Sequence, residues 1–76
     1  MKTRTQLEDM LVEMLTGAVG GTADQWRQAI GPVTVYPLAT RPTPNWSVQA
    51  GGSATEQAAI DMAAEIVRAE HPYGMR

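Results

Sequence analysis

The side chains that could perform acid–base chemistry in this chain are His71, Asp61 and Glu65, which fall on one predicted helix. A general acid and a general base must both reach the same reacting atoms. Residues three or four positions apart share a helix face, but His71 follows Glu65 by six positions and Asp61 by ten. Pro72 ends the helix at His71. A charged imidazole at this position is stabilised by the helix dipole, so a capping role for His71 is the simpler interpretation. The spacing therefore predicts no catalytic residue, and we expect the chain not to be an enzyme.

The glycine pair Gly51-Gly52 before Ser53 is a second place where chemistry is conceivable. Free backbone N–H groups at a helix start can bind phosphate, but this stretch lacks the lysine and the spacing of a P-loop. We interpret it as a strand-to-helix turn. The chain has no cysteine and a single histidine, which excludes disulfides and argues against a zinc site made of protein ligands. We therefore expect no cofactor and no metal.

A region without charge is the first candidate for a binding surface. Between residues 28 and 55 the only charged side chain is Arg41, which lies in a loop framed by prolines. The same region holds Tyr36 and Trp46. Protein interfaces are enriched in Tyr, Trp and Arg and poor in Lys, Glu and Asp. One interpretation is that these three residues contact another protein. The other is that they belong to the domain's own sheet and core. Both interpretations hold together if one face of the hairpin packs on the core and the opposite face contacts the partner.

Three acidic residues near the start of the chain are the second candidate. Glu8, Asp9 and Glu13 fall on the outer side of a predicted helix, opposite its apolar residues. Such a group of carboxylates is usually a solvated surface. The three carboxylates could also bind a basic patch on a nucleic-acid-binding protein.

The chain has 76 residues, a formal net charge of −2 and an isoelectric point near 5.1, and we expect one domain over residues 1–76. Nucleic-acid binding needs a basic face, so it is disfavoured. The alternative function is nevertheless a nucleic-acid-associated module, in which Lys2, Arg4, Arg27 and Arg41 together contact the nucleic acid. The apolar runs are too short to span a membrane, and acidic residues follow the basic start of the chain too soon for a signal peptide. We therefore expect a cytoplasmic protein that makes no membrane contact.

Apolar periodicity predicts three helices, over residues 5–16, 22–30 and 53–70. Each begins with a hydroxyl residue followed three positions later by Glu or Gln, the capping-box pattern. These pairs are Thr5 with Glu8, Thr22 with Gln25, and Ser53 with Glu56. In the first helix the predicted core face is Leu7, Met10, Leu11, Met14 and Leu15. In the second it is Trp26, Ala29 and Ile30. In the third it is Ala59, Ile60, Met62, Ala63, Ile66 and Val67.

Alternating apolar residues predict two strands, over residues 33–39 and 45–50. The predicted class is a small α+β domain of order α-α-β-β-α, in which a two-stranded antiparallel hairpin packs on the long C-terminal helix. Pro37 lacks an N–H donor, which favours an edge position for the first strand. That edge offers a route to a dimer. Residues 71–76 are expected to form a short tail, either ordered or flexible.

Residues 26–33, 37–40, 45–48 and 69–73 resemble small uncharacterised proteins of proteobacterial genomes and prophages. Small acidic phage accessory proteins, including anti-CRISPR proteins, are similar in size and charge. The resemblance implies a protein that binds another macromolecule, and it transfers no residue roles. We therefore expect a non-catalytic, inhibitor-like protein-interaction module, bacterial or phage-encoded, that binds a protein partner or a second copy of itself. A small enzyme or enzyme subunit ranks third, after the nucleic-acid-associated module.

Overall fold

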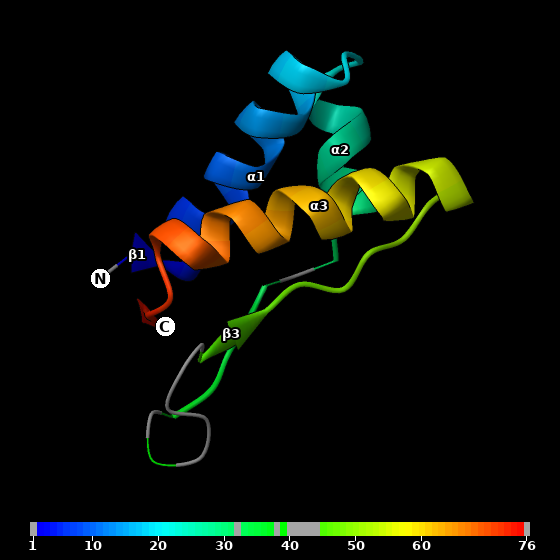
Figure 1. Cartoon of the computed structure of the whole chain (residues 1–76). Helices are drawn as coiled ribbons and strands as arrows, with labels where there is room; N and C mark the ends of the chain where they lie inside the picture. The colour runs from blue at the N-terminus through cyan, green and yellow to red at the C-terminus, as the bar shows by residue number, and fades with distance from the viewer. Residues whose placement is uncertain (1, 32, 38, 40–44, 76) are drawn as a thin grey trace.

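The computed structural model describes residues 2–31, 33–37, 39 and 45–75. Its elements follow the order β1 (Lys2–Thr3), α1 (Arg4–Ala18), α2 (Ala23–Ala29), β2 (Thr34–Val35), β3 (Trp46–Ser47), α3 (Ala54–Glu70) and β4 (Gly74–Met75). α3 runs across the molecule in Figure 1, with α1 and α2 above it and β3 below it. This arrangement of helices and short strands is consistent with the expected α+β class.

α1 begins earlier in the chain than the capping pattern predicts. Thr3 is its N-cap, and its hydroxyl accepts a hydrogen bond from the Gln6 N–H at 3.2 Å. In return, Oε1 of Gln6 accepts a hydrogen bond from the Thr3 N–H at 2.8 Å. The predicted pairing of Thr5 with Glu8 is therefore wrong. Both pairs have the Ser/Thr-x-x-Glu/Gln spacing, and the local pattern alone does not choose between them.

α2 is short and is held by its tryptophan, as predicted. Thr22 caps it by accepting a hydrogen bond from the Gln25 N–H at 3.1 Å. Trp26 is 2% exposed, and its indole N–H donates to the Gly20 carbonyl at 2.7 Å. Gly20 has a φ of 101°, a left-handed conformation that glycine adopts at little cost. The glycine-rich connection thus turns the chain back so that α2 lies against α1.

α3 has the predicted capping box of Ser53 with Glu56, but its buried side is narrower than predicted. Ile60 and Val67 are fully buried, whereas Met62 is 67% and Ile66 is 44% exposed. Two residues advance about 200° around a helix, so Met62 points away from Ile60. The prediction that Met62 and Ile66 belong to the core face is wrong. The large fully buried side chains are Trp26, Trp46, Leu7, Leu11, Leu15, Ile60, Val33 and Val67.

The predicted hairpin is present but short. β2 and β3 pair antiparallel with Thr34 opposite Ser47 and Val35 opposite Trp46. Closer to the helices, an isolated bridge joins Ile30 to Ala50. The two segments thus run alongside each other over more of their length than the strands cover. β2 is thus shorter than the predicted strand 33–39, whose residue 38 lies outside the described residues, as do residues 40–44 of the loop that follows.

The C-terminal segment pairs with the start of the chain. β4 runs parallel to β1, with Lys2 opposite Gly74 and Thr3 opposite Met75. Gly74 is buried, and a Cβ atom at this position would lie 2.9 Å from Cδ1 of Leu7. The sequence predicted neither strand, because two residues with no alternating pattern carry no periodic signal.

Candidate functional site

The hairpin residues that the sequence singled out do not form one exposed surface. Trp46 is 1% exposed, and its indole N–H donates to the His71 carbonyl at 2.8 Å. The guanidinium carbon of Arg68 lies 5.4 Å from the centroid of its ring. Trp46 is thus a core residue covered by α3 and the segment after it, and its place in the candidate binding surface is corrected here. Arg41 lies outside the described residues.

Tyr36 belongs to the hairpin and is half-buried. Its hydroxyl shares a hydrogen bond of 3.3 Å with Oγ of Ser47. Its backbone N–H donates to the Asn45 carbonyl at 2.7 Å, which continues the pairing of β2 with β3. Tyr36 therefore stabilises the hairpin on the side of β3, and the residue as a whole is only partly exposed.

The three acidic residues of α1 have different environments. One carboxylate oxygen of Glu8 accepts a hydrogen bond from the Val33 N–H at 3.1 Å. Asp9 forms an ion pair of 2.7 Å with Arg27 on α2. Glu13 is exposed. Two of the three side chains thus connect α1 to other elements, and Glu13 remains as a surface charge.

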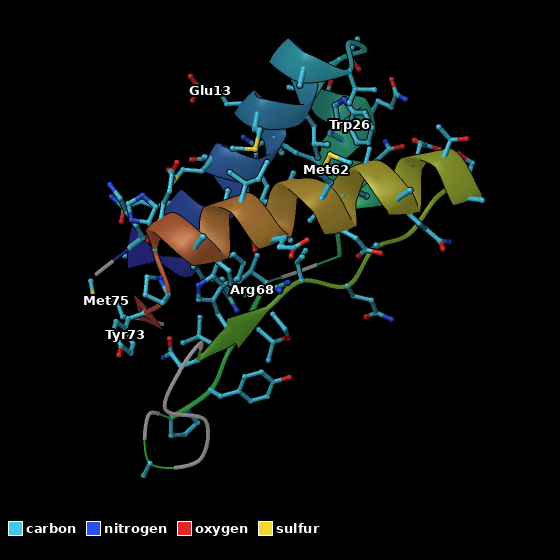
Figure 2. All side chains as sticks on the ribbon, in the orientation of Figure 1. Glu13, Trp26, Met62, Arg68, Tyr73 and Met75 are labelled. Atoms are coloured by element: carbon cyan, nitrogen blue, oxygen red, sulfur yellow. The ribbon has the colours of Figure 1, made fainter. Side chains whose placement is uncertain are left out.

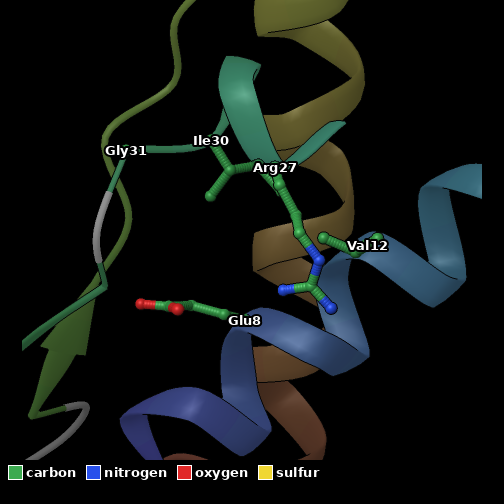
Figure 3. Close-up of a pocket in the computed structure, with 5 residues that line it drawn as sticks. All are labelled: Glu8, Val12, Arg27, Ile30 and Gly31. Atoms are coloured by element: carbon green, nitrogen blue, oxygen red, sulfur yellow. The ribbon is translucent and has the colours of Figure 1, made fainter. Parts of the chain in front are cut away.

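A hollow of about 290 Å³ lies between α1 and the end of α2, lined by Glu8, Val12, Arg27, Ile30 and Gly31. Figure 3 shows Glu8 extending from α1 toward the strand that follows Gly31, while Arg27 reaches down from α2. Because Glu8 and Arg27 are already engaged with Val33 and Asp9, the hollow offers a ligand few polar groups that are not already paired. We therefore give it a structural role in joining α1 to α2.

His71 is the C-cap of α3, as the sequence predicted. Its backbone N–H donates to the Val67 carbonyl at 2.7 Å. At the other end of the helix, the Glu56 carboxylate occupies the place where a phosphate would bind. It accepts a hydrogen bond from the Ser53 N–H at 3.0 Å. That bond and a second one from the Gln25 side chain keep the pKa of Glu56 below its usual value.

The structure contains one surface feature that the sequence interpretation missed. A groove of about 240 Å³ runs between α1 and α3, and its walls are almost entirely apolar. Figure 2 shows Met62 on the side of α3 that borders α1. The residues that line the groove are Met14, Leu15, Ala18, Val19, Ala58, Ala59, Met62, Ala63 and Ile66. We call this surface the α1/α3 face.

A signal for this face was present in the sequence. The apolar residues of α3 extend around more of the helix than one packed neighbour can cover, because Met62 and Ile66 lie outside the buried arc. Val19, just past the end of α1, is also 56% exposed. Such excess apolar width is typical of a helix that has a second partner.

Comparison with models of known families, with curated proteins and with solved structures gives no match. Among the described residues, no group of three or more His, Cys, Asp or Glu side chains could hold a metal ion. Within the same residues, no helix is both long and apolar enough to cross a membrane.

Proposed function

We propose that this chain is a non-catalytic protein-interaction module that binds another protein through the α1/α3 face. The observation that carries the proposal is the exposure of Met62, Val19 and Ile66 on one groove. Single exposed apolar side chains are ordinary, but a contiguous apolar patch is typical of a contact surface.

The shape of the face supports this function. Ala18, Ala59 and Ala63 line the groove with small side chains, so a partner can approach the helix backbones closely. Met14 and Met62 flank the groove, and the unbranched thioether side chain adapts to partners of different shape. A face of this kind suits a helix that inserts its own apolar side chains between two helices of its receptor.

Two of the positive side chains that a nucleic-acid partner could use are engaged within the domain. Arg27 is paired with Asp9, and Arg68 lies over the ring of Trp46. Both cations are thus engaged within the domain, on different elements. A phosphate backbone is bound by several accessible Lys and Arg side chains on one face.

Site-specific photo-crosslinking in cells that carry the gene tests the proposal. We expect a benzoylphenylalanine at position 62 to capture a distinct protein, identified by mass spectrometry. The control places the same group at position 28, an exposed site on α2. Capture at position 62 should disappear when Ile66→Glu is added. Equal capture at both positions, or none at position 62, contradicts the proposal.

A further inference from the structure

The segment that follows α3 is bound through its main chain. It comprises residues 71–75, which we call the strap, and it passes from the end of α3 to β1 (Figure 1). Its first two carbonyls accept hydrogen bonds from the Trp46 indole N–H at 2.8 Å and from the Asn45 N–H at 3.2 Å. The Asn45 side chain then pairs with both the N–H and the carbonyl of Gly74. Each of these bonds uses a main-chain atom of the strap, so the site recognises an extended backbone rather than particular side chains.

The place that Gly74 occupies has no room for a larger residue. A Cβ atom at this position would lie 2.9 Å from Cδ1 of Leu7 and 3.3 Å from Cδ1 of Trp46. Both of these side chains are fully buried, so neither can move aside without disturbing a closely packed core. The surface beneath the strap is thus a slot that offers hydrogen bonds to a main chain and admits glycine at one position.

The strap adds no side chain to the hydrophobic core of the described residues. The cluster of buried apolar side chains spans residues 7–67, so it ends before the strap begins. Within the strap only Gly74 is buried, while Tyr73 and Met75 project from it (Figure 2) and are 40% and 45% exposed. Release of the strap therefore breaks hydrogen bonds and one short strand pairing, but it leaves the packing among α1, α2 and α3 in place.

We propose that the strap is the intramolecular ligand of a peptide-binding slot, and that it opens as a unit while the helices stay folded. The slot takes an extended peptide segment with glycine at the position of Gly74. In sites that bind extended peptides, main-chain hydrogen bonds supply affinity and the fit of side chains supplies specificity. Here the specificity comes from the lack of space for a Cβ atom. The slot residues Leu7, Asn45 and Trp46 do not line the α1/α3 face, so this inference is independent of the proposed function.

Hydrogen exchange of the wild-type chain, followed by NMR, tests the opening. Three protons report on the strap, which are the Gly74 N–H, the Asn45 N–H and the Trp46 indole N–H. We expect them to have similar protection factors, at least tenfold lower than that of Leu11 in the buried part of α1. Urea should affect them less than Leu11, because a local opening exposes less surface than unfolding does. Protection equal to that of Leu11, with the same dependence on urea, overturns the proposal.

Peptide binding to the full chain tests the slot. Gly74→Val should prevent the strap from docking, whereas Met75→Val places the same residue at the next, exposed position and should leave the strap docked. The ligand is a peptide with the sequence of residues 71–75, acetylated and amidated at its ends. It is titrated to about 10 mM, because a tethered segment acts at an effective concentration in the millimolar range.

The peptide should bind only where the slot is open. We expect it to shift the Trp46 indole N–H resonance of the Gly74→Val chain toward its wild-type position. Binding to the wild-type and Met75→Val chains should be at least tenfold weaker, since their own strap occupies the slot. A second peptide, in which valine replaces the glycine, should bind none of the three chains.

Two further results would contradict the proposal. Gly74→Val should keep the helical circular dichroism of the wild type, and loss of that signal would mean that the strap cannot be released alone. Absence of peptide binding to Gly74→Val, or equal binding of the peptide to the wild-type chain, would mean that the surface beneath the strap is not a peptide site.

Discussion

Asn45 and Gly74 exchange two hydrogen bonds, although they lie 29 positions apart in the sequence. The Gly74 N–H donates to Oδ1 of Asn45 at 2.7 Å, and Nδ2 of Asn45 donates to the Gly74 carbonyl at 2.9 Å. The same Nδ2 also donates to the Tyr36 carbonyl at 3.0 Å. Asn45 is 2% exposed, so its side chain is a buried polar group that joins the hairpin to the C-terminal segment.

Asn45→Ala should destabilise the domain by about 2–4 kcal/mol, because it leaves the buried N–H and carbonyl of Gly74 without these partners. Asn45→Asp should be at least as harmful, since a carboxylate would face the carbonyls of Tyr36 and Gly74. Urea unfolding followed by circular dichroism measures both. Gln49→Ala, at an exposed position nearby, is the control and should change little. A small effect of Asn45→Ala would contradict the bridging role.

The two sides of α3 should respond differently to charge. Ile60→Asp should abolish cooperative unfolding, because Ile60 is fully buried and an unpaired core charge costs more than a small domain can lose. Met62→Glu should change stability by about 0.5 kcal/mol or less. Ile66, which the sequence pattern placed on the core face, is 44% exposed, so Ile66→Asp should cost only about 1 kcal/mol. Thermal unfolding of Met62→Glu that resembles that of Ile60→Asp would contradict this placement of the helix.

Glu56 should make stability depend on pH in acid. The Ser53 N–H and then the Gln25 side chain lower the pKa of Glu56 in the folded state. A lowered folded-state pKa stabilises the fold above the unfolded pKa, about 4.3 for Glu, and this contribution is lost as pH falls through the folded value. Glu56→Gln keeps a capping acceptor, as Gln6 does in α1, but cannot titrate.

Urea unfolding at pH 7, 5, 4 and 3 compares the wild type with Glu56→Gln. The stability difference between the two proteins should be greatest at pH 5 to 7 and should shrink toward pH 3. A difference that does not vary over this range would show that Glu56 has the same pKa in both states.

The ion pair between Asp9 and Arg27 should contribute little to stability. Its side chains are 53% and 49% exposed, and exposed pairs are typically worth about 0–1 kcal/mol. A double-mutant cycle with Asp9→Asn and Arg27→Gln measures the coupling. We expect it to fall further in 1 M NaCl, where the Debye length is about 3 Å. A coupling of about 2 kcal/mol or more would indicate that the pair is better shielded from water than its exposure suggests.

The elements that the sequence predicts well are those determined by neighbouring residues. Ser53 and Glu56 satisfy each other's backbone N–H groups within one turn. The start of α3 can therefore be predicted from residues that are close in the sequence. Trp26 is the large apolar side chain of a short amphipathic helix, and its burial follows from that pattern. The ranges of the three helices are accordingly close to those predicted.

The features that the sequence does not predict depend on distant residues. The choice of Thr3 over Thr5 as the N-cap places Thr3 in β1, which pairs with β4 at the other end of the chain. Glu8 is left free to accept the Val33 N–H, 25 positions away. Likewise, the side of α3 that α1 covers decides whether Met62 is core or surface. Local periodicity carries none of this information.

The pairing of β1 with β4 has a consequence for synthesis of the chain. α1 can form early, since its hydrogen bonds are local, but its Leu7 side chain is packed against Gly74, which is synthesised long after it. Until Gly74 has emerged from the ribosome, the Asn45 side chain also lacks its reciprocal partner. A chain that has not yet reached Gly74 would therefore leave Leu7 less covered, and transiently exposed apolar surface of this kind favours aggregation. The short pairing of β4 with β1 thus completes the cover over the Leu7 side chain.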